Sequence, residues 1–214
     1  MSRNQLPEDA RLIKTISHDD IKAFAKEAYK VEGTPRTVFS LVVFICIGSF
    51  GATLTYSLTK GFGQGNWEFF IQFVLSFLAN FTILLVLHEL LHGLAYKYYG
   101  SQRLYFGANL KKLIFYAASD QEYYNGREFV VIALLPIITI SLLLITGMIL
   151  LPGYLIFFGT TLAVHALMAQ GDYALVIYTL QFEGASFFTM DSRDKKESYF
   201  YLKGVEAEQP SEDE

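Results

Sequence analysis

The sequence has little charge and a single cysteine. Of its 214 residues, 18% are charged and 52% are hydrophobic, so the apolar share lies at the upper edge of the range for soluble proteins. The single cysteine, Cys46, excludes a disulfide scaffold. A formal net charge of −4 argues against nucleic-acid binding, which usually requires a basic patch. No apolar run stands near Met1, so we expect no cleaved signal peptide.

Four apolar runs are long enough to cross a bilayer, whose hydrocarbon core of about 30 Å needs about 20 helical residues. They are residues 38–58, 67–98, 129–151 and 154–180. Only Pro152 and Gly153 separate the last two runs, which predicts an antiparallel helical hairpin. We therefore expect an all-α membrane protein with four transmembrane helices, embedded in the lipid bilayer. An even number of spans places both termini on the same side.

The distribution of Lys and Arg predicts the orientation, because these residues are retained on the cytosolic face. The N-terminal region holds seven of the 17, the loop after the second span five when Lys97 at the end of that span is counted with it, and the C-terminal region four. The loop after the first span holds only Lys60. Both termini and the loop 99–128 are therefore expected in the cytosol.

This reading divides the chain into an N-terminal region (1–36), a membrane domain (37–180) and a C-terminal region (181–214). In the first region Ser17 and Asp20 resemble a capping pair before a short amphipathic helix. That helix either lies on an anionic leaflet or packs on the protein itself. Residues 205–214 contain five acids and no base, which predicts a solvated, disordered tail.

The second run contains the string HELLHG, in which His88, Glu89 and His92 form the HExxH pattern of zinc peptidases. Residues four apart share one helix face, so both imidazoles can reach one Zn²⁺. Zinc lowers the pKa of water, and Glu89 can accept its proton and deliver it to the leaving amine. The alternative is a pair of structural histidines hydrogen-bonded between helices, with Glu89 as their counter-ion.

A metal site needs at least one more protein ligand, and the last run offers Asp172 and His165 on one helical face. A helix rises 1.5 Å per residue, so the depth of a residue can be counted from the outer end of its span. On this count His88 lies about 32 Å deep, Asp172 about 27 Å and His165 about 17 Å, so Asp172 matches the depth of the motif better than His165 does. We therefore expect Asp172 as the third ligand, with His165, Asp120 and Glu122 as alternatives. If His165 is not a ligand, three roles remain for it: a hydrogen-bonding partner of a ligand, a stabiliser of the oxyanion, or a packed polar residue.

The loop after the motif predicts a short β-hairpin. Residues 103–106 and 113–117 are β-prone and aromatic-rich, and residues 107–110 separate them. A hairpin that directly follows the motif helix could offer an unpaired edge to an extended peptide. The other interpretation is that it only covers the helix ends.

These features resemble the bacterial putative zincin peptidases, small multispanning proteins assigned by their HExxH motif. The resemblance covers roughly residues 70–180. It rests on HELLHG at the end of a membrane helix, the β-prone stretch, ALLP at 133–136 and the later His165, Gly171 and Asp172. More distantly the chain is similar to the intramembrane site-two metalloproteases, in which a downstream acid on another helix follows HExxH.

The resemblance implies a protein of the bacterial plasma membrane in which His88, His92 and Asp172 bind zinc and Glu89 is the base. Site-two proteases usually show Asn-x-x-Pro before an Asp-Gly pair. This chain departs from that pattern, with Ala at 133 and the order Gly-Asp at 171–172.

We therefore expect a membrane-embedded zinc metalloprotease that hydrolyses a peptide or membrane-protein substrate near the cytosolic side of the bilayer. The alternative is a non-enzymatic accessory or immunity protein whose polar cluster binds a structural metal or a partner helix. A transporter is disfavoured because the sequence shows no inverted repeat and no chain of intramembrane charges.

Overall fold

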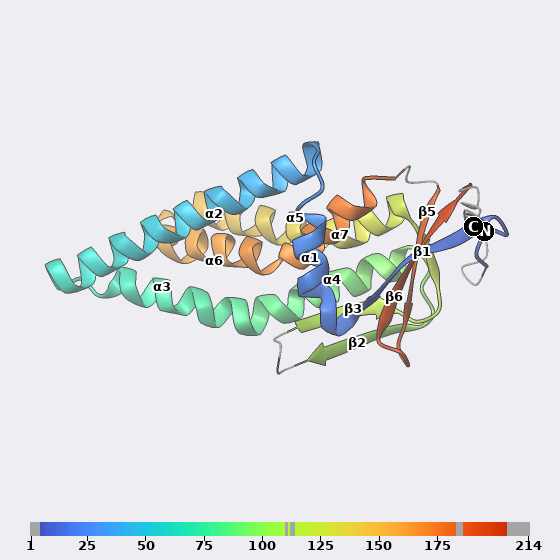
Figure 1. Ribbon diagram of the computed structural model, residues 1–214. Coiled ribbons are helices and arrows are strands. Elements are labelled where there is room, and N and C mark those ends of the chain that lie inside the picture. The colour runs from blue at the N-terminus through green and yellow to red at the C-terminus, as the bar shows by residue number, and fades with distance from the viewer. Residues whose placement is uncertain (1–4, 110, 112–113, 183–185, 205–214) are drawn as a thin grey trace.

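A computed structural model describes residues 5–109, 111, 114–182 and 186–204 of the chain. Long helices form one end of the molecule and small antiparallel sheets the other (Figure 1). The predicted acidic tail at 205–214 and part of the predicted hairpin turn lie outside the described residues.

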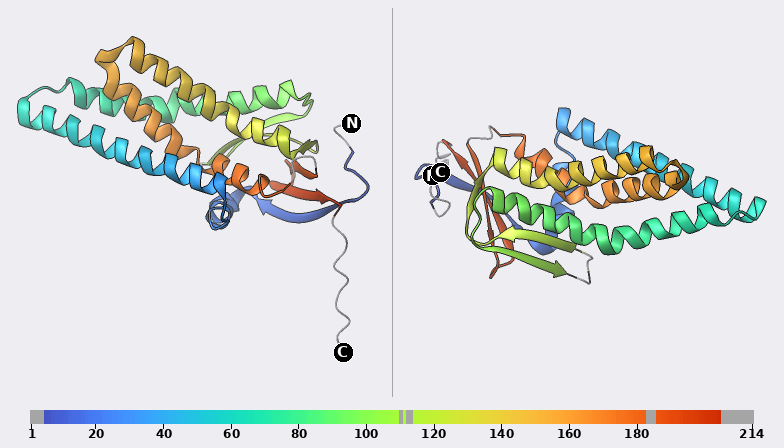
Figure 2. Two further views of the ribbon diagram at one scale, coloured as in Figure 1. Left: turned by 90° about the horizontal axis from the view of Figure 1, so that it is seen from above. Right: turned by 180° about the vertical axis from the view of Figure 1, so that it is seen from behind.

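The helical end contains the four apolar runs. α2 (Thr34–Leu58) continues into the π-helical segment η2 (Thr59–Gly63), and α3 (Glu68–Ala79) continues through the π-helical segment η3 (Asn80–Leu84) into α4 (Leu85–Tyr98). α5 (Gly126–Leu150) is followed by the 3₁₀ turn η4 (Pro152–Tyr154), which leads into α6 (Leu155–Met168) and α7 (Gln170–Thr179). The very short connection through η4 turns α6 back along α5, as predicted for a helical hairpin (Figure 2).

Three of these helical stretches, Thr34–Gly63, Glu68–Tyr98 and Gly126–Leu150, are long and apolar enough to cross a membrane. The last run was expected to be the fourth membrane span. It bends by 50° between Met168 and Gln170, and it makes a fourth span only if the bent pair is counted as one. The backbone of Ala169 leaves the helical region there, with ψ at 15°. These three or four candidate membrane helices indicate a multi-pass membrane protein.

The all-α expectation is wrong, because strands from near both chain ends and a short strand from the middle of the chain form a four-stranded antiparallel sheet in the order β1-β6-β5-β4. Its strands are β1 (Ala10–Ser17), β4 (Tyr123–Asn125), β5 (Phe187–Ser192) and β6 (Glu197–Lys203). β1 has four exposed residues of eight and a single buried one, and its burial pattern lacks the alternation that marks a half-buried strand. It forms through backbone pairing with β6, from the opposite end of the chain.

The predicted hairpin is present as β2 (Leu104–Asn109) and β3 (Ile114–Ser119), paired antiparallel from Leu104↔Ser119 to Asn109↔Ile114. Both strands are longer than predicted, because Gly107 lies within β2 instead of in the turn. Gly107 pairs with Tyr116, and a Cβ at this glycine would lie 2.2 Å from the Tyr116 Cζ atom. The glycine is therefore needed so that the tyrosine ring can cross over β2.

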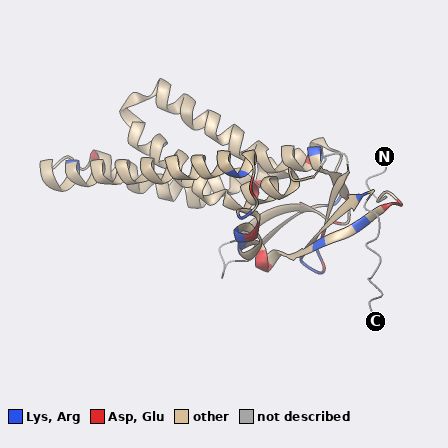
Figure 3. Cartoon of the chain, turned by 45° about the horizontal axis from the view of Figure 1, so that its top comes forward, with Lys and Arg blue, Asp and Glu red and all other residues tan. Residues whose placement is uncertain are grey.

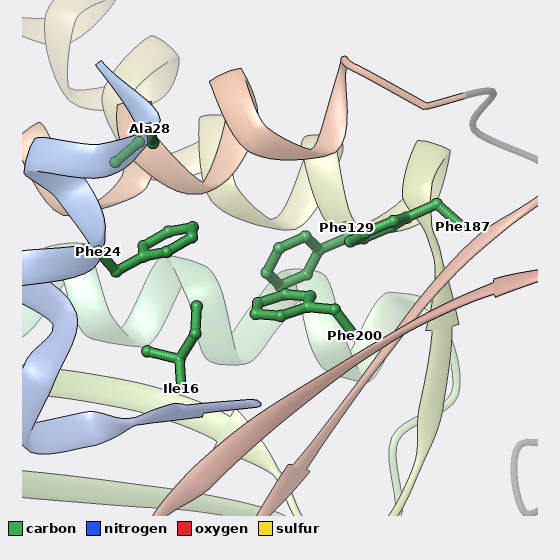
Figure 4. Packing of buried hydrophobic residues seen from close by; sticks show 7 residues of the cluster. Ile16, Phe24, Ala28, Phe129, Phe187 and Phe200 are labelled. Atoms are coloured by element: carbon green, nitrogen blue, oxygen red, sulfur yellow. The ribbon is translucent and has the colours of Figure 1, made fainter. Parts of the chain in front are cut away.

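A hydrophobic core joins the sheet to the helices (Figure 4). α1 (Ile21–Ala28) packs against α7 and buries Phe24 and Ala28, so the predicted amphipathic helix lies on its own protein. The division of the chain at residues 36 and 180 stays a prediction, although this core draws on all three segments. Its buried members are Ile16, Phe24, Ala28, Phe129, Ala174, Phe187 and Phe200.

Charged residues gather at the sheet end, whereas the helical end is almost free of them (Figure 3). Because β1 pairs with β6, the N-terminal and C-terminal segments lie side by side at that end. That both termini share one side of the membrane stays a prediction.

Candidate metal centre

Two histidines from α4 form the base of the site. His88 and His92 are four residues apart, so they share one face of the helix, and both are buried, with 8% and 7% of their surface exposed. Their Nε2 atoms lie 3.1 Å from each other. The predicted i, i+4 geometry therefore aims both imidazoles at one point.

The third group comes from the first turn of α7. The Asp172 carboxylate places Oδ2 3.1 Å from His88 Nε2 and Oδ1 3.3 Å from His92 Nε2. The bend at Ala169 starts a new helix just before this aspartate, and the N-terminus of a helix favours negative charge. The structure thus brings Asp172 to the two histidines from a segment that follows them by 80 residues.

The spacing of these atoms fits a tetrahedral metal. Nitrogen and oxygen ligands about 2.0–2.1 Å from a zinc ion stand about 3.3–3.4 Å from one another. The three distances in the site are 3.1, 3.1 and 3.3 Å. In the described part of the chain, His88, His92 and Asp172 are the group of His, Cys, Asp and Glu residues that could hold a metal ion.

The remaining ring nitrogen of each histidine has its own partner. His92 Nδ1 lies 2.8 Å from the backbone oxygen of Ile132 in α5, and His88 Nδ1 lies 3.0 Å from His165 Nε2 in α6. A neutral imidazole that donates from Nδ1 keeps the lone pair of Nε2 for a metal. His165 therefore lies behind His88, on the side of the ring that faces away from the three-residue group.

Glu89 stands beside the histidines in the same cavity. Its Oε2 atom is buried and has no hydrogen-bond partner among the described residues. The backbone N–H of Ala117 in β3 donates a hydrogen bond to the same carboxylate. A buried carboxylate oxygen without a hydrogen-bond partner costs free energy, so its presence points to a functional role for this oxygen.

The cavity in front of the centre has a volume of about 890 Å³. Residues of α4, α5, α6 and α7 line it, together with residues of α1 and β3. The hairpin can approach α4 closely because residue 93, directly after the motif, is glycine. A Cβ at Gly93 would lie 3.0 Å from Phe106 and 3.3 Å from Leu104, both in β2. The sequence HELLHG thus combines the metal donors with a close helix–hairpin contact.

Sequence reasoning missed a second polar cluster in this cavity. His18 Nε2 lies 3.3 Å from Ser198 Oγ and 3.8 Å from Asp191 Oδ1, and its ring meets Tyr116 edge-on. His18 follows β1, whereas Asp191 and Ser198 belong to β5 and β6. No local motif links these residues, so only the folded sheet reveals the cluster.

The alternative acids of the loop are engaged elsewhere. Asp120 Oδ1 accepts a hydrogen bond of 2.8 Å from the backbone N–H of Arg193. The Glu122 carboxylate accepts hydrogen bonds from Ser119 and from the backbone of Gln102. Burial acts to raise the pKa of Glu122, but these hydrogen bonds outweigh it and hold the pKa below its ordinary value.

Comparison with known families now identifies the chain. The family model described as Putative zincin peptidase matches residues 81–187, half of the chain. The chain belongs to this family. The match confirms the resemblance seen in the sequence, and it spans the motif helix, the hairpin, α5, α6 and α7.

The family region ends at the beginning of β5 and excludes β1, α1 and β6. Part of the cavity wall therefore comes from segments outside the region by which this peptidase family is recognised. No curated protein and no solved structure matches the chain.

Proposed function

We propose that this chain is a membrane-embedded zinc metalloprotease that hydrolyses peptide bonds near the cytosolic side of the membrane. His88, His92 and Asp172 would hold the zinc ion, and Glu89 would be the catalytic base. The observation that carries the proposal is the convergence of these three donors in one cavity, beside the Glu89 carboxylate, which has one buried oxygen without a hydrogen-bond partner among the described residues.

When bound, zinc supplies a Lewis acid that lowers the pKa of water toward neutrality and polarises a carbonyl group. Glu89 moves the proton. Its Oε2 accepts the proton that water loses as oxygen attacks the peptide carbonyl, and it returns this proton to the amide nitrogen that leaves. The backbone N–H of Ala117 holds the carboxylate in place during both transfers.

His165 supports the centre without being one of the donors. Its Nε2 lies 3.0 Å from His88 Nδ1, and by accepting a hydrogen bond there it would keep the His88 proton on Nδ1 and leave Nε2 free on the side of Asp172. Among the three roles that the sequence left open, this geometry favours the hydrogen-bonding partner of a ligand.

The substrate would bind as an extended strand along β3. Within the described residues, Ile114–Ser119 pairs with β2 alone, and the Ala117 N–H faces the catalytic base instead of β2. Alternate residues of a strand present their backbone groups to the same edge, so Phe115 shares the edge of Ala117. A peptide added there would lie beside Glu89 with its bonds unshielded by helix formation.

The proposal can be tested by the metal content of detergent-purified protein. We expect about one zinc ion per wild-type chain, and strong loss of zinc in His88→Ala and Asp172→Ala. His18→Ala removes a histidine of the same cavity that is not a proposed ligand, so it should keep its zinc. Zinc retained by Asp172→Ala would contradict the third ligand.

A second experiment, with the variant Glu89→Gln, distinguishes an enzyme from a non-enzymatic accessory protein. This variant should keep zinc but lose proteolysis, measured as new N-termini released from a solubilised membrane-protein mixture. Glu32→Gln, an exposed glutamate outside the cavity, is the matched control. Equal cleavage by Glu89→Gln and wild type would refute the assigned base.

A further inference from the structure

Pro136 stands inside α5, where a proline changes the backbone hydrogen bonding. In an α-helix the N–H of residue i donates to the carbonyl oxygen of residue i−4, and the partner of residue 136 is Ile132. Proline has no N–H, and its ring also crowds that carbonyl and tilts it away from the helix axis. The Ile132 oxygen thus lacks its regular helical donor.

This same oxygen lies 2.8 Å from Nδ1 of His92. Ile132 is 2% exposed and His92 is 7% exposed, so water does not compete for either group. A freed carbonyl in a membrane helix must find another donor, because the bilayer core offers none. The imidazole N–H of His92 provides it.

The other described prolines of the helical end occupy different positions. Pro35 and Pro152 stand in the first turns of α2 and η4, where a helix does not use the missing N–H. Pro136 alone among them removes an interior hydrogen bond, and the carbonyl that it frees is the one beside His92.

We propose that Pro136 is a positioning residue that reserves the Ile132 carbonyl for His92. The hydrogen bond keeps the His92 proton on Nδ1 and leaves the Nε2 lone pair facing His88 and Asp172. With an alanine at position 136, a backbone N–H returns to the helix and competes for the same oxygen. This inference rests on the proposed metal centre, because Pro136 acts by orienting His92, one of its proposed ligands.

The test distinguishes two ways in which Pro136 could act, through its missing backbone N–H or through the shape of its ring. Pro136→Ala restores the N–H, whereas lactic acid incorporated at position 136 has neither the N–H nor the ring. Pro152→Ala is the control, since it removes a proline from the turn between α5 and α6. Each protein is purified in detergent, and ¹⁵N-histidine NMR of the metal-free form measures where His92 carries its proton. Chelator competition then measures zinc affinity.

We expect Pro136→Ala to reduce the population of His92 protonated at Nδ1 and to weaken zinc binding about tenfold, the usual cost of losing a ligand's outer hydrogen bond. The lactic acid variant should restore both quantities, and Pro152→Ala should change neither. An unaltered His92 signal in Pro136→Ala overturns the proposal. Equal impairment or loss of folding in the alanine and lactic acid variants also overturns it, because the ring would then be what matters.

The NMR measurement needs neither zinc nor substrate. A chain without proteolytic activity would therefore refute the proposed function while leaving the placement of the His92 proton measurable. Conversely, active enzyme with an unchanged His92 in Pro136→Ala would refute only the role of Pro136.

Discussion

At the scale of single residues, the centre is held by hydrogen bonds on its outer side. His88 and His92 each engage a partner through Nδ1, and each aims Nε2 at Asp172. Polar groups buried in a membrane protein are costly when unpaired, so such partners orient the rings before a metal arrives. The group of His88, His92 and Asp172 is therefore oriented by residues outside it.

Glu122 shows how a buried acid can be structural instead of catalytic. Only 3% of it is exposed, and its carboxylate ties the start of the hairpin to its end through Gln102 and Ser119. The hydrogen bonds hold its pKa below the ordinary value. This acid stabilises the fold only while it is ionised.

We expect Glu122→Gln to lower the free energy of unfolding by about 1–2 kcal/mol at pH 7, because charge-assisted hydrogen bonds are lost. A lowered folded-state pKa contributes stability above the unfolded pKa of about 4.3, and this contribution disappears as the pH falls through the folded value. The difference from wild type should therefore vanish at acidic pH. Denaturant unfolding at several pH values measures it, with Glu32→Gln as control. A difference that is independent of pH would contradict this explanation.

At the scale of elements, irregular helix segments surround the centre. The π-helical segment η3 directly precedes α4, and the 50° bend separates α6 from α7. Asn80 of η3 donates through Nδ2 to the backbone oxygen of Thr161 in α6 at 3.3 Å. Side-chain amides in membrane helices hold neighbouring helices together in this way. This contact therefore holds η3, which continues into the histidine helix α4, against α6.

The contact between β2 and β3 depends on Gly107, whose open face holds the ring of Tyr116. We expect Gly107→Ala to destabilise the protein by about 1–3 kcal/mol, because the added Cβ overlaps this ring. In a Tyr116→Ala background the same change should cost much less, so a double-mutant cycle measured by denaturant unfolding should show coupling. Gly153→Ala is the control, since nothing lies within 4 Å of its Cβ position. Additive effects of the two changes would rule out the clash.

At the scale of the whole molecule, the two chain ends close the cavity that the helices leave open. β1 and β6 pair, and residues next to or within them line the cavity together with the metal centre. These strands lie outside the family region at 81–187. The candidate metal centre thus lies in the part that matches the family, whereas β1 and β6 contribute to the cavity wall from outside it.

The charge distribution predicts the orientation of the molecule in the membrane. In a Cys46→Ser background, Gln64→Cys lies beside Lys60 in the loop after the first span, and Lys30→Cys lies at the opposite end of α2. We expect a membrane-impermeant maleimide to label only Gln64→Cys in intact cells, because the basic segments stay in the cytosol. Lys30→Cys should react after permeabilisation. Labelling of Lys30→Cys in intact cells would reverse the proposed topology.

The sequence by itself determined the features that depend on neighbouring residues. Lipid requires helices of about 20 apolar residues, so hydropathy alone located the helical runs. The i, i+4 spacing of His88 and His92 likewise needs only one helix turn, and the family resemblance rested on this motif. Even the hairpin was predictable, because β2 and β3 are close in sequence.

Only the tertiary structure decided what joins distant segments. The pairing of β1 with β6, the bend that turns Asp172 toward the histidines, and the His18 cluster all depend on contacts between residues far apart in the chain. A local pattern carries no information about such pairs, since either partner alone looks like an ordinary loop, strand or helix residue. The same holds for Pro136, which shows its effect only where the carbonyl that it frees meets a histidine of another helix.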